Sequence, residues 1–92
     1  MIKVINTFEY GDNTHIIYHA DAAGDVLAPG LHDHTWDHLC VPMSGKIEVF
    51  FDDREPIEMV PGESPVQFPA LRMHGIRALT DGAVFMGIQK TP

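Results

Sequence analysis

Short runs of hydrophobic residues alternate along this chain with breaks made of Gly, Pro, Asn and Asp. Runs of this length, separated at regular intervals by turn residues, are typical of β-sandwiches and small β-barrels. No stretch shows a helical period with caps, and the prolines exclude a helix interior near them. The sequence therefore predicts an all-β protein, with its clearest strands at Thr14–Ala20, Lys46–Phe51, Ile57–Val60, Gly75–Leu79 and Ala83–Gln89.

Two parts of this pattern predict local structure in more detail. The run Lys46–Phe51 alternates polar and apolar residues before it becomes wholly apolar, so Ile47, Val49 and Phe51 are expected to face the core. Asp81-Gly82 lies between two apolar runs. This dipeptide favours a type I′ turn, so it predicts a two-residue hairpin that joins those runs.

The chain has 92 residues, and we interpret residues 1–92 as a single domain. A domain of this size buries only a modest core, so a metal or a partner subunit would add to its stability. A short barrel also leaves strand edges open. We therefore expect a homodimer, in which an N-terminal strand such as Ile2–Phe8 pairs with another subunit.

Composition and charge narrow the range of partners. Thirteen acidic residues against six basic ones give a net charge of −7, which opposes binding to nucleic acid and to anionic membranes. No apolar run approaches the roughly 20 residues of a membrane span. The first residues do not resemble a secretory signal, and the single cysteine, Cys40, excludes an internal disulfide. These features predict a cytoplasmic protein.

The six histidines are the unusual feature of the composition. His32 and His34 would share one face of an extended strand, and His38 follows four residues later. His74 follows a proline-flanked turn, from which a neighbouring strand would bring it over the same face. Neutral imidazole is the commonest metal ligand in proteins. The pattern therefore predicts a divalent transition-metal site whose metal (Fe, Zn, Ni, Mn, Co or Cu) the ligand type alone does not select.

Two other interpretations of these histidines stay open. They would also be compatible with hydrogen-bonded surface or core histidines, or with adventitious capture of nickel during purification. His15 and His19 lie four residues apart and would share a strand face, but nothing else marks them, so we interpret them as structural.

The residues resemble the two motifs of the cupin family. His32, His34, position 38 and Gly45 have the spacing of the first motif, while Gly62, Pro69 and His74 match positions of the second. The short segment Lys46–Pro61 between the motifs is similar to that of small single-domain cupins. The resemblance implies a small antiparallel jelly-roll or cupin barrel, with His32, His34, His38 and His74 as metal ligands inside it.

The chain departs from the cupin pattern at several positions. Val26, Leu71 and Ala78 replace two glycines and an asparagine, and the spacing from Gly62 to Pro69 is one residue longer than usual. The chemically important change is His38, which stands where the family has a glutamate. Four neutral histidines leave a divalent ion with a charge of about +2, which would favour anionic oxygen ligands and disfavour Mg²⁺ or Ca²⁺. Alternatively, His38 stays outside the coordination shell and leaves a three-histidine site with open positions.

Cupins include dioxygenases, isomerases, lyases and proteins without a known reaction, so the resemblance supports two hypotheses. The first is a small metalloenzyme that acts on a compact anionic or enolisable small molecule. The second is a non-catalytic module that binds a metal or a small ligand. Near the histidines, Cys40 is interpreted as a small buried residue rather than a ligand. Arg72, Gln67 and Gln89 are candidate polar residues of a pocket.

Overall fold

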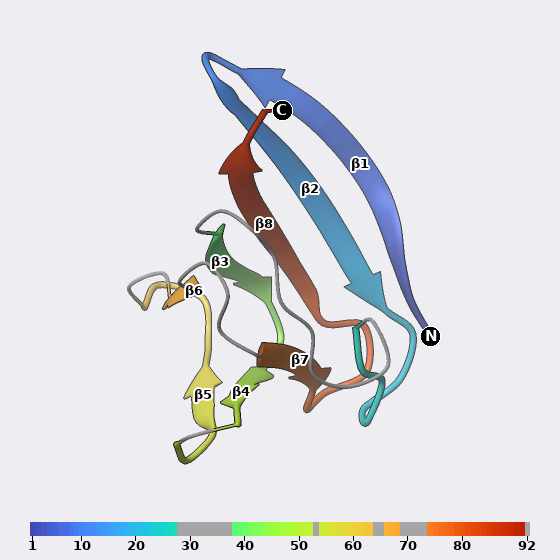
Figure 1. The fold of residues 1–92 in the computed structure, drawn as a ribbon. Helices are drawn as coiled ribbons and strands as arrows, with labels where there is room; N and C mark the ends of the chain where they lie inside the picture. The colour runs from blue at the N-terminus through green and yellow to red at the C-terminus, as the bar shows by residue number, and fades with distance from the viewer. Residues whose placement is uncertain (28–37, 53, 64–65, 69–73, 92) are drawn as a thin grey trace.

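The structure is a computed structural model that describes residues 1–27, 38–52, 54–63, 66–68 and 74–91. Eight strands occur in these ranges, and all their pairings are antiparallel (Figure 1). None of the described residues forms a helix, and accordingly none forms a helix able to cross a membrane. The strands are β1 (Ile2–Tyr10), β2 (Asn13–Ala20), β3 (His38–Ser44), β4 (Ile47–Phe51), β5 (Ile57–Met59), β6 (Val66–Phe68), β7 (His74–Ala78) and β8 (Val84–Lys90).

The strands form two sheets. The larger has the order β1-β2-β8-β3-β6, and the smaller has the order β5-β4-β7. The hairpin of β1 and β2 turns at Gly11, whose φ of 61° suits the absence of a Cβ atom. This hairpin extends away from the smaller sheet, and β1 is the outermost strand of its sheet (Figure 1). The hairpin thus gives the larger sheet a long projecting end.

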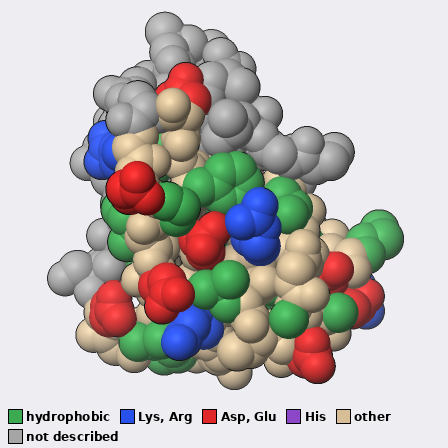
Figure 2. All heavy atoms as spheres, turned by 90° about the horizontal axis from the view of Figure 1, so that it is seen from below, with side chains coloured by type: hydrophobic (Ala, Val, Ile, Leu, Met, Phe, Trp, Pro, Cys, Tyr) green, Lys and Arg blue, Asp and Glu red, His purple; other side chains and the backbone are tan. Residues whose placement is uncertain are grey.

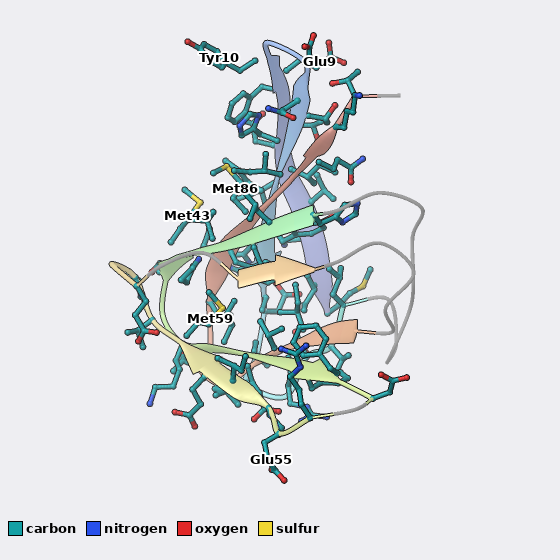
Figure 3. All side chains as sticks on the ribbon, turned by 60° about the vertical axis from the view of Figure 1, so that its left-hand side comes forward. Glu9, Tyr10, Met43, Glu55, Met59 and Met86 are labelled. Carbon is teal, nitrogen blue, oxygen red and sulfur yellow. The ribbon has the colours of Figure 1, made fainter. Side chains whose placement is uncertain are left out.

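The hydrophobic core lies between the two sheets. Ile47, Val49 and Phe51 are 1%, 0% and 7% exposed, which confirms the inward face predicted from their alternation. The larger sheet contributes Phe85, which is fully buried and stacks on Tyr18 with ring centroids 5.1 Å apart. Figure 3 shows Met59 between the sheets. The inward residues of the two sheets therefore form one shared core.

A tight turn at Gly45 connects β3, in one sheet, to β4, in the other. Gly45 has a φ of 74°, and a Cβ atom there would lie 2.5 Å from Thr80 Oγ1. The same hydroxyl oxygen accepts a hydrogen bond of 3.0 Å from the backbone N–H of Lys46. Gly45 is the last position of the first motif, and its conformation and surroundings explain why glycine fits there.

All five expected strands are confirmed, with shifts of one residue at one or both ends, but the hairpin predicted at Asp81-Gly82 is wrong. A turn does occur there, with Gly82 at a φ of 71°. However, β7 before it pairs with β4, whereas β8 after it pairs with β2 and β3. The turn therefore carries the chain from one sheet to the other. The dipeptide indicates a local turn, but only tertiary packing selects the strand partners.

The hydrophobic pattern did not mark β3 or β6 as strands. Within β3, the buried Pro42 lies opposite Phe85, and the register shifts between Pro42 and Ser44. Proline donates no hydrogen bond to a sheet and is tolerated where a bulge interrupts the ladder. The bulge after Pro42 therefore explains how a proline-containing segment forms a central strand.

Candidate metal centre

His38 is the first residue of β3 and lies on the inner face of the larger sheet. Successive side chains of a strand alternate between its faces, and the next residues on this face, Cys40 and Pro42, are buried. The His38 side chain is half-buried. β3 therefore places this imidazole at the end of a row of inward-facing residues, of which the other two, Cys40 and Pro42, are buried.

His74 occupies the corresponding place in the smaller sheet, since it is the first residue of β7. Its backbone pairs with Phe51, and the residues two and four positions later, Ile76 and Ala78, belong to the core. The side chain of His74 and the whole of His32 and His34 lie outside what the structure describes. The predicted four-histidine site is thus untested, and within the described ranges no three His, Cys, Asp or Glu residues gather as a metal site.

Gln89 is the cross-strand neighbour of His38. The register of β3 and β8 places the two residues directly opposite each other, and that of β2 and β8 places Thr14 on the other side of Gln89. Side chains directly opposite in antiparallel strands have Cβ atoms about 4.5–5.5 Å apart. Among the candidate polar residues, Gln89 therefore lies within side-chain reach of a predicted ligand. Arg72 and the side chain of Gln67 are outside the described residues.

The inner face of the larger sheet carries two polar groups near His38, those of Cys40 and Tyr18, and both stay uncharged at neutral pH. Cys40 is 1% exposed, and burial raises the pKa of its thiol to about 12. Burial also raises the pKa of the Tyr18 hydroxyl, and repulsion from the ionised Cys40 thiolate at high pH adds to that increase. Neither group is therefore ionised near pH 7. Cys40 has the buried position expected of a small core residue.

His15 and His19 lie on the opposite face of the larger sheet from His38. Tyr18 packs against the core and Ala20 is part of it, so the alternating positions of β2 point outward. The ring of His15 stacks on Phe8 with centroids 4.7 Å apart, and His19 Nδ1 lies 3.4 Å from Asp21 Oδ1. These contacts agree with the structural interpretation of both histidines and separate them from the proposed site.

The ligand type of His38 separates transition metals from hard cations. The described ligand candidate is an imidazole, and its described neighbours on the inner wall are uncharged. Mg²⁺ and Ca²⁺ require several oxygen ligands, usually carboxylates, whereas imidazole suits Zn, Fe, Cu, Ni, Co and Mn. Among the predicted ligands, only the side chain of His38 is described, and an imidazole is a ligand type that these transition metals accept.

Comparison with solved structures identifies the fold. A cupin superfamily protein from Desulfitobacterium hafniense superposes with a TM-score of 0.79 over 100% of this chain and 79% of that one, at 18% identity. A protein containing a cupin-2 domain from Shewanella frigidimarina gives 0.71 over 98% and 79% of the two chains, at 21% identity. The chain has a cupin fold.

A third similar structure shows this fold inside a larger protein. A transcriptional regulator of the HTH_3 family from Vibrio cholerae superposes with a TM-score of 0.73 at 25% identity, over 99% of this chain and 51% of that one. No family model matches the sequence, and no curated protein matches it. The cupin fold predicted from the motifs is thus confirmed, while these similarities leave the ligand and any reaction to be argued from the residues.

Proposed function

We propose that this cupin binds one divalent transition metal through His32, His34, His38 and His74. The observation that carries the proposal is the place of His38, which starts β3 on the inner face next to a buried wall. The start of β7 at His74, next to the core residues Ile76 and Ala78, supports the assignment of the fourth histidine. Two histidines from the first motif would complete the set. The spacing of the motif and the cupin fold support this step.

The residues around His38 would orient its ring and would add no charge to the metal site. Metal-bound histidines usually donate their second ring N–H to a nearby acceptor, and the amide oxygen of Gln89, directly opposite on the neighbouring strand, would serve as that acceptor for His38. Neutral Cys40 and Tyr18 add no negative charge to the wall. The ligand set therefore leaves a net positive centre, which selects a compact anionic or enolisable small molecule. A divalent metal supplies Lewis-acid or oxygen-activating chemistry to such a molecule.

A second candidate function is a binding module without catalysis. The cupin-fold part of the Vibrio cholerae regulator is similar to this chain over 99% of its length, so the fold occurs outside stand-alone domains. In that case the metal would only anchor a small ligand or the barrel. An exchangeable ligand position separates the two functions, because catalysis requires one. Four histidines leave no such position on a tetrahedral ion, but they leave one or two on a five- or six-coordinate ion.

Metal content after purification without a nickel column tests the proposal. We expect about one equivalent of a transition metal per wild-type chain and almost none in His34→Ala/His74→Ala. The matched control is His15→Ala/His19→Ala, which removes two histidines that lie on the opposite face of the larger sheet and should retain the metal. Equal metal contents in all three proteins, or loss in the control alone, would contradict the proposed site.

A further inference from the structure

The Tyr18 hydroxyl, on the inner face of the larger sheet, has no hydrogen-bond partner in the part of the chain that the structure describes. Tyr18 is half-buried, and its ring packs against the core, where it stacks on Phe85. The hydroxyl oxygen is nevertheless not sealed from solvent. Tyrosine hydroxyls in buried positions usually find a hydrogen-bond partner. The Tyr18 hydroxyl is therefore available to a ligand on this face.

Gly87 lies beside Tyr18 on the same face, between Ile16 of β2 and Cys40 of β3. Among the described residues, only Tyr18 Cε2, at 3.6 Å, would come within 4 Å of a Cβ atom on Gly87. That distance is an ordinary van der Waals contact, and Gly87 does not have the positive φ that favours glycine. A glycine inside a strand often marks a place where a ligand comes close. Gly87 therefore leaves space that a larger side chain would fill.

The Tyr18 ring leans from β2 over β8, towards the strand that carries His38. It lies above Gly87, which pairs with Cys40 of β3. The next inward pair along these two strands is Gln89 and His38, two residues farther on. Two residues of a strand span about 7 Å. A small molecule bound to a metal at His38 would therefore come within reach of the Tyr18 hydroxyl.

The charged side chains of the described strands lie away from this part of the inner face. The inward positions of β2, β3 and β8 hold no Asp, Glu, Lys or Arg. On the outer face of the smaller sheet, Glu48 accepts a hydrogen bond of 2.9 Å from Arg77, and Glu58 Oε2 lies 3.8 Å from Lys46 Nζ. Figure 2 shows acidic and basic side chains interspersed at the end of the molecule where β4 and β5 lie. The larger sheet would therefore orient a ligand through neutral groups such as the Tyr18 hydroxyl.

We propose that the Tyr18 hydroxyl donates a hydrogen bond to an oxygen atom of the small molecule that binds the metal, in the space left by Gly87. This inference rests on the proposed function, because it requires a metal at His38. The ligand class is a compact carboxylate or enolate, whose oxygen atoms bind the metal and accept a hydrogen bond at the same time. Because burial raises the pKa of Tyr18, the phenol stays protonated at neutral pH and acts as the donor.

Binding of acetohydroxamate to the Co²⁺-loaded protein tests this inference. Acetohydroxamate is a compact chelator that coordinates as an anion through two oxygen atoms, and its binding is followed by the visible absorption of Co²⁺. Tyr18→Phe removes only the hydroxyl and should weaken binding about tenfold, the usual effect of losing a hydrogen bond to a charged group. The matched control is Tyr10→Phe, because Tyr10 is 78% exposed on the outermost strand, and this variant should bind as the wild type does.

Two substitutions at Gly87 test the space beside the ring. Gly87→Ala adds a methyl group in ordinary contact with Tyr18 and should bind acetohydroxamate nearly as the wild type does. Gly87→Leu fills the space and should abolish measurable binding. Metal content and the ligand-free Co²⁺ spectrum should stay unchanged in all these variants, and circular dichroism verifies their fold. A merely structural role of Tyr18 or Gly87 would alter the ligand-free spectrum as well.

Metal content measured on the same samples separates this inference from the proposed function. A wild type without bound metal would overturn the proposed function and, with it, the assignment of Tyr18. A wild type that holds Co²⁺ but does not bind acetohydroxamate would overturn the inference alone. So would a folded, metal-loaded Tyr18→Phe protein that binds the chelator as tightly as the wild type. Equal weakening in Tyr10→Phe would contradict the inference too, since the loss would then not depend on the inner face.

Discussion

Replacing Phe85 by alanine is expected to destabilise the fold by about 3–5 kcal/mol, the usual cost of removing a buried aromatic ring. Phe85 is fully buried, and its ring stacks on Tyr18 in the core between the two sheets. A domain of this size has a total stability of roughly 5–15 kcal/mol. The variant should therefore unfold at a much lower urea concentration than the wild type, with a similar slope of the transition.

Phe50→Ala is the matched control for Phe85→Ala. Phe50 belongs to β4 but is only half-buried, and the Arg77 guanidinium lies 5.1 Å from its ring centroid. Its loss should cost only about 1 kcal/mol, from partial burial and the cation–π contact. Urea unfolding followed by circular dichroism measures both variants. Equal loss of stability in the two would show that the core does not centre on the contact between the sheets.

Acidification is expected to release the bound metal completely. Histidine has an ordinary pKa of about 6.5, and a protonated imidazole cannot ligate a metal. The proton therefore competes with the metal, so that binding is present above this pKa and is lost as the pH falls through it. Occupancy should drop from about one equivalent at pH 7.5 to almost none near pH 5.

The same prediction has a consequence for stability. A metal that binds only the folded state raises the free energy of unfolding by RT ln(1 + [L]/Kd), which amounts to about 2.7 kcal/mol at a free concentration of 100 Kd. The rise in melting temperature on adding Zn²⁺ should therefore be large at pH 7.5 and absent near pH 5. His34→Ala/His74→Ala should show no rise at either pH. A pH-independent rise in the wild type would contradict histidine ligation.

Much of the fold could be predicted because short strands leave a local signature. The alternation of Ile47, Val49 and Phe51 is a property of one strand, and the structure confirms it. The partner of a strand is a property of the whole molecule. For that reason Asp81-Gly82 indicated a turn correctly but a hairpin wrongly. The central strand β3 escaped detection because Pro42 weakens its signature, and the bulge that accommodates Pro42 is visible only in the register.

The sequence could predict which residue types would form the candidate site, but not which residues of other strands would lie beside them. The histidine spacing and Gly45 identified the first motif, and the cupin fold is now confirmed. Gln89 is 51 positions from His38 in the sequence, so only the pairing of β3 with β8 reveals that the two are opposite each other.

X-ray absorption spectroscopy at the metal edge tests the central claim most directly, because it counts the imidazoles around the ion. In the Zn²⁺-loaded wild type, the account predicts four imidazole nitrogens at about 2.0–2.1 Å. It predicts that His38→Gln retains three of them, while His15→Ala/His19→Ala retains all four. A first shell without imidazole scattering in the wild type, or a shell unchanged in His38→Gln, would contradict the four-histidine site.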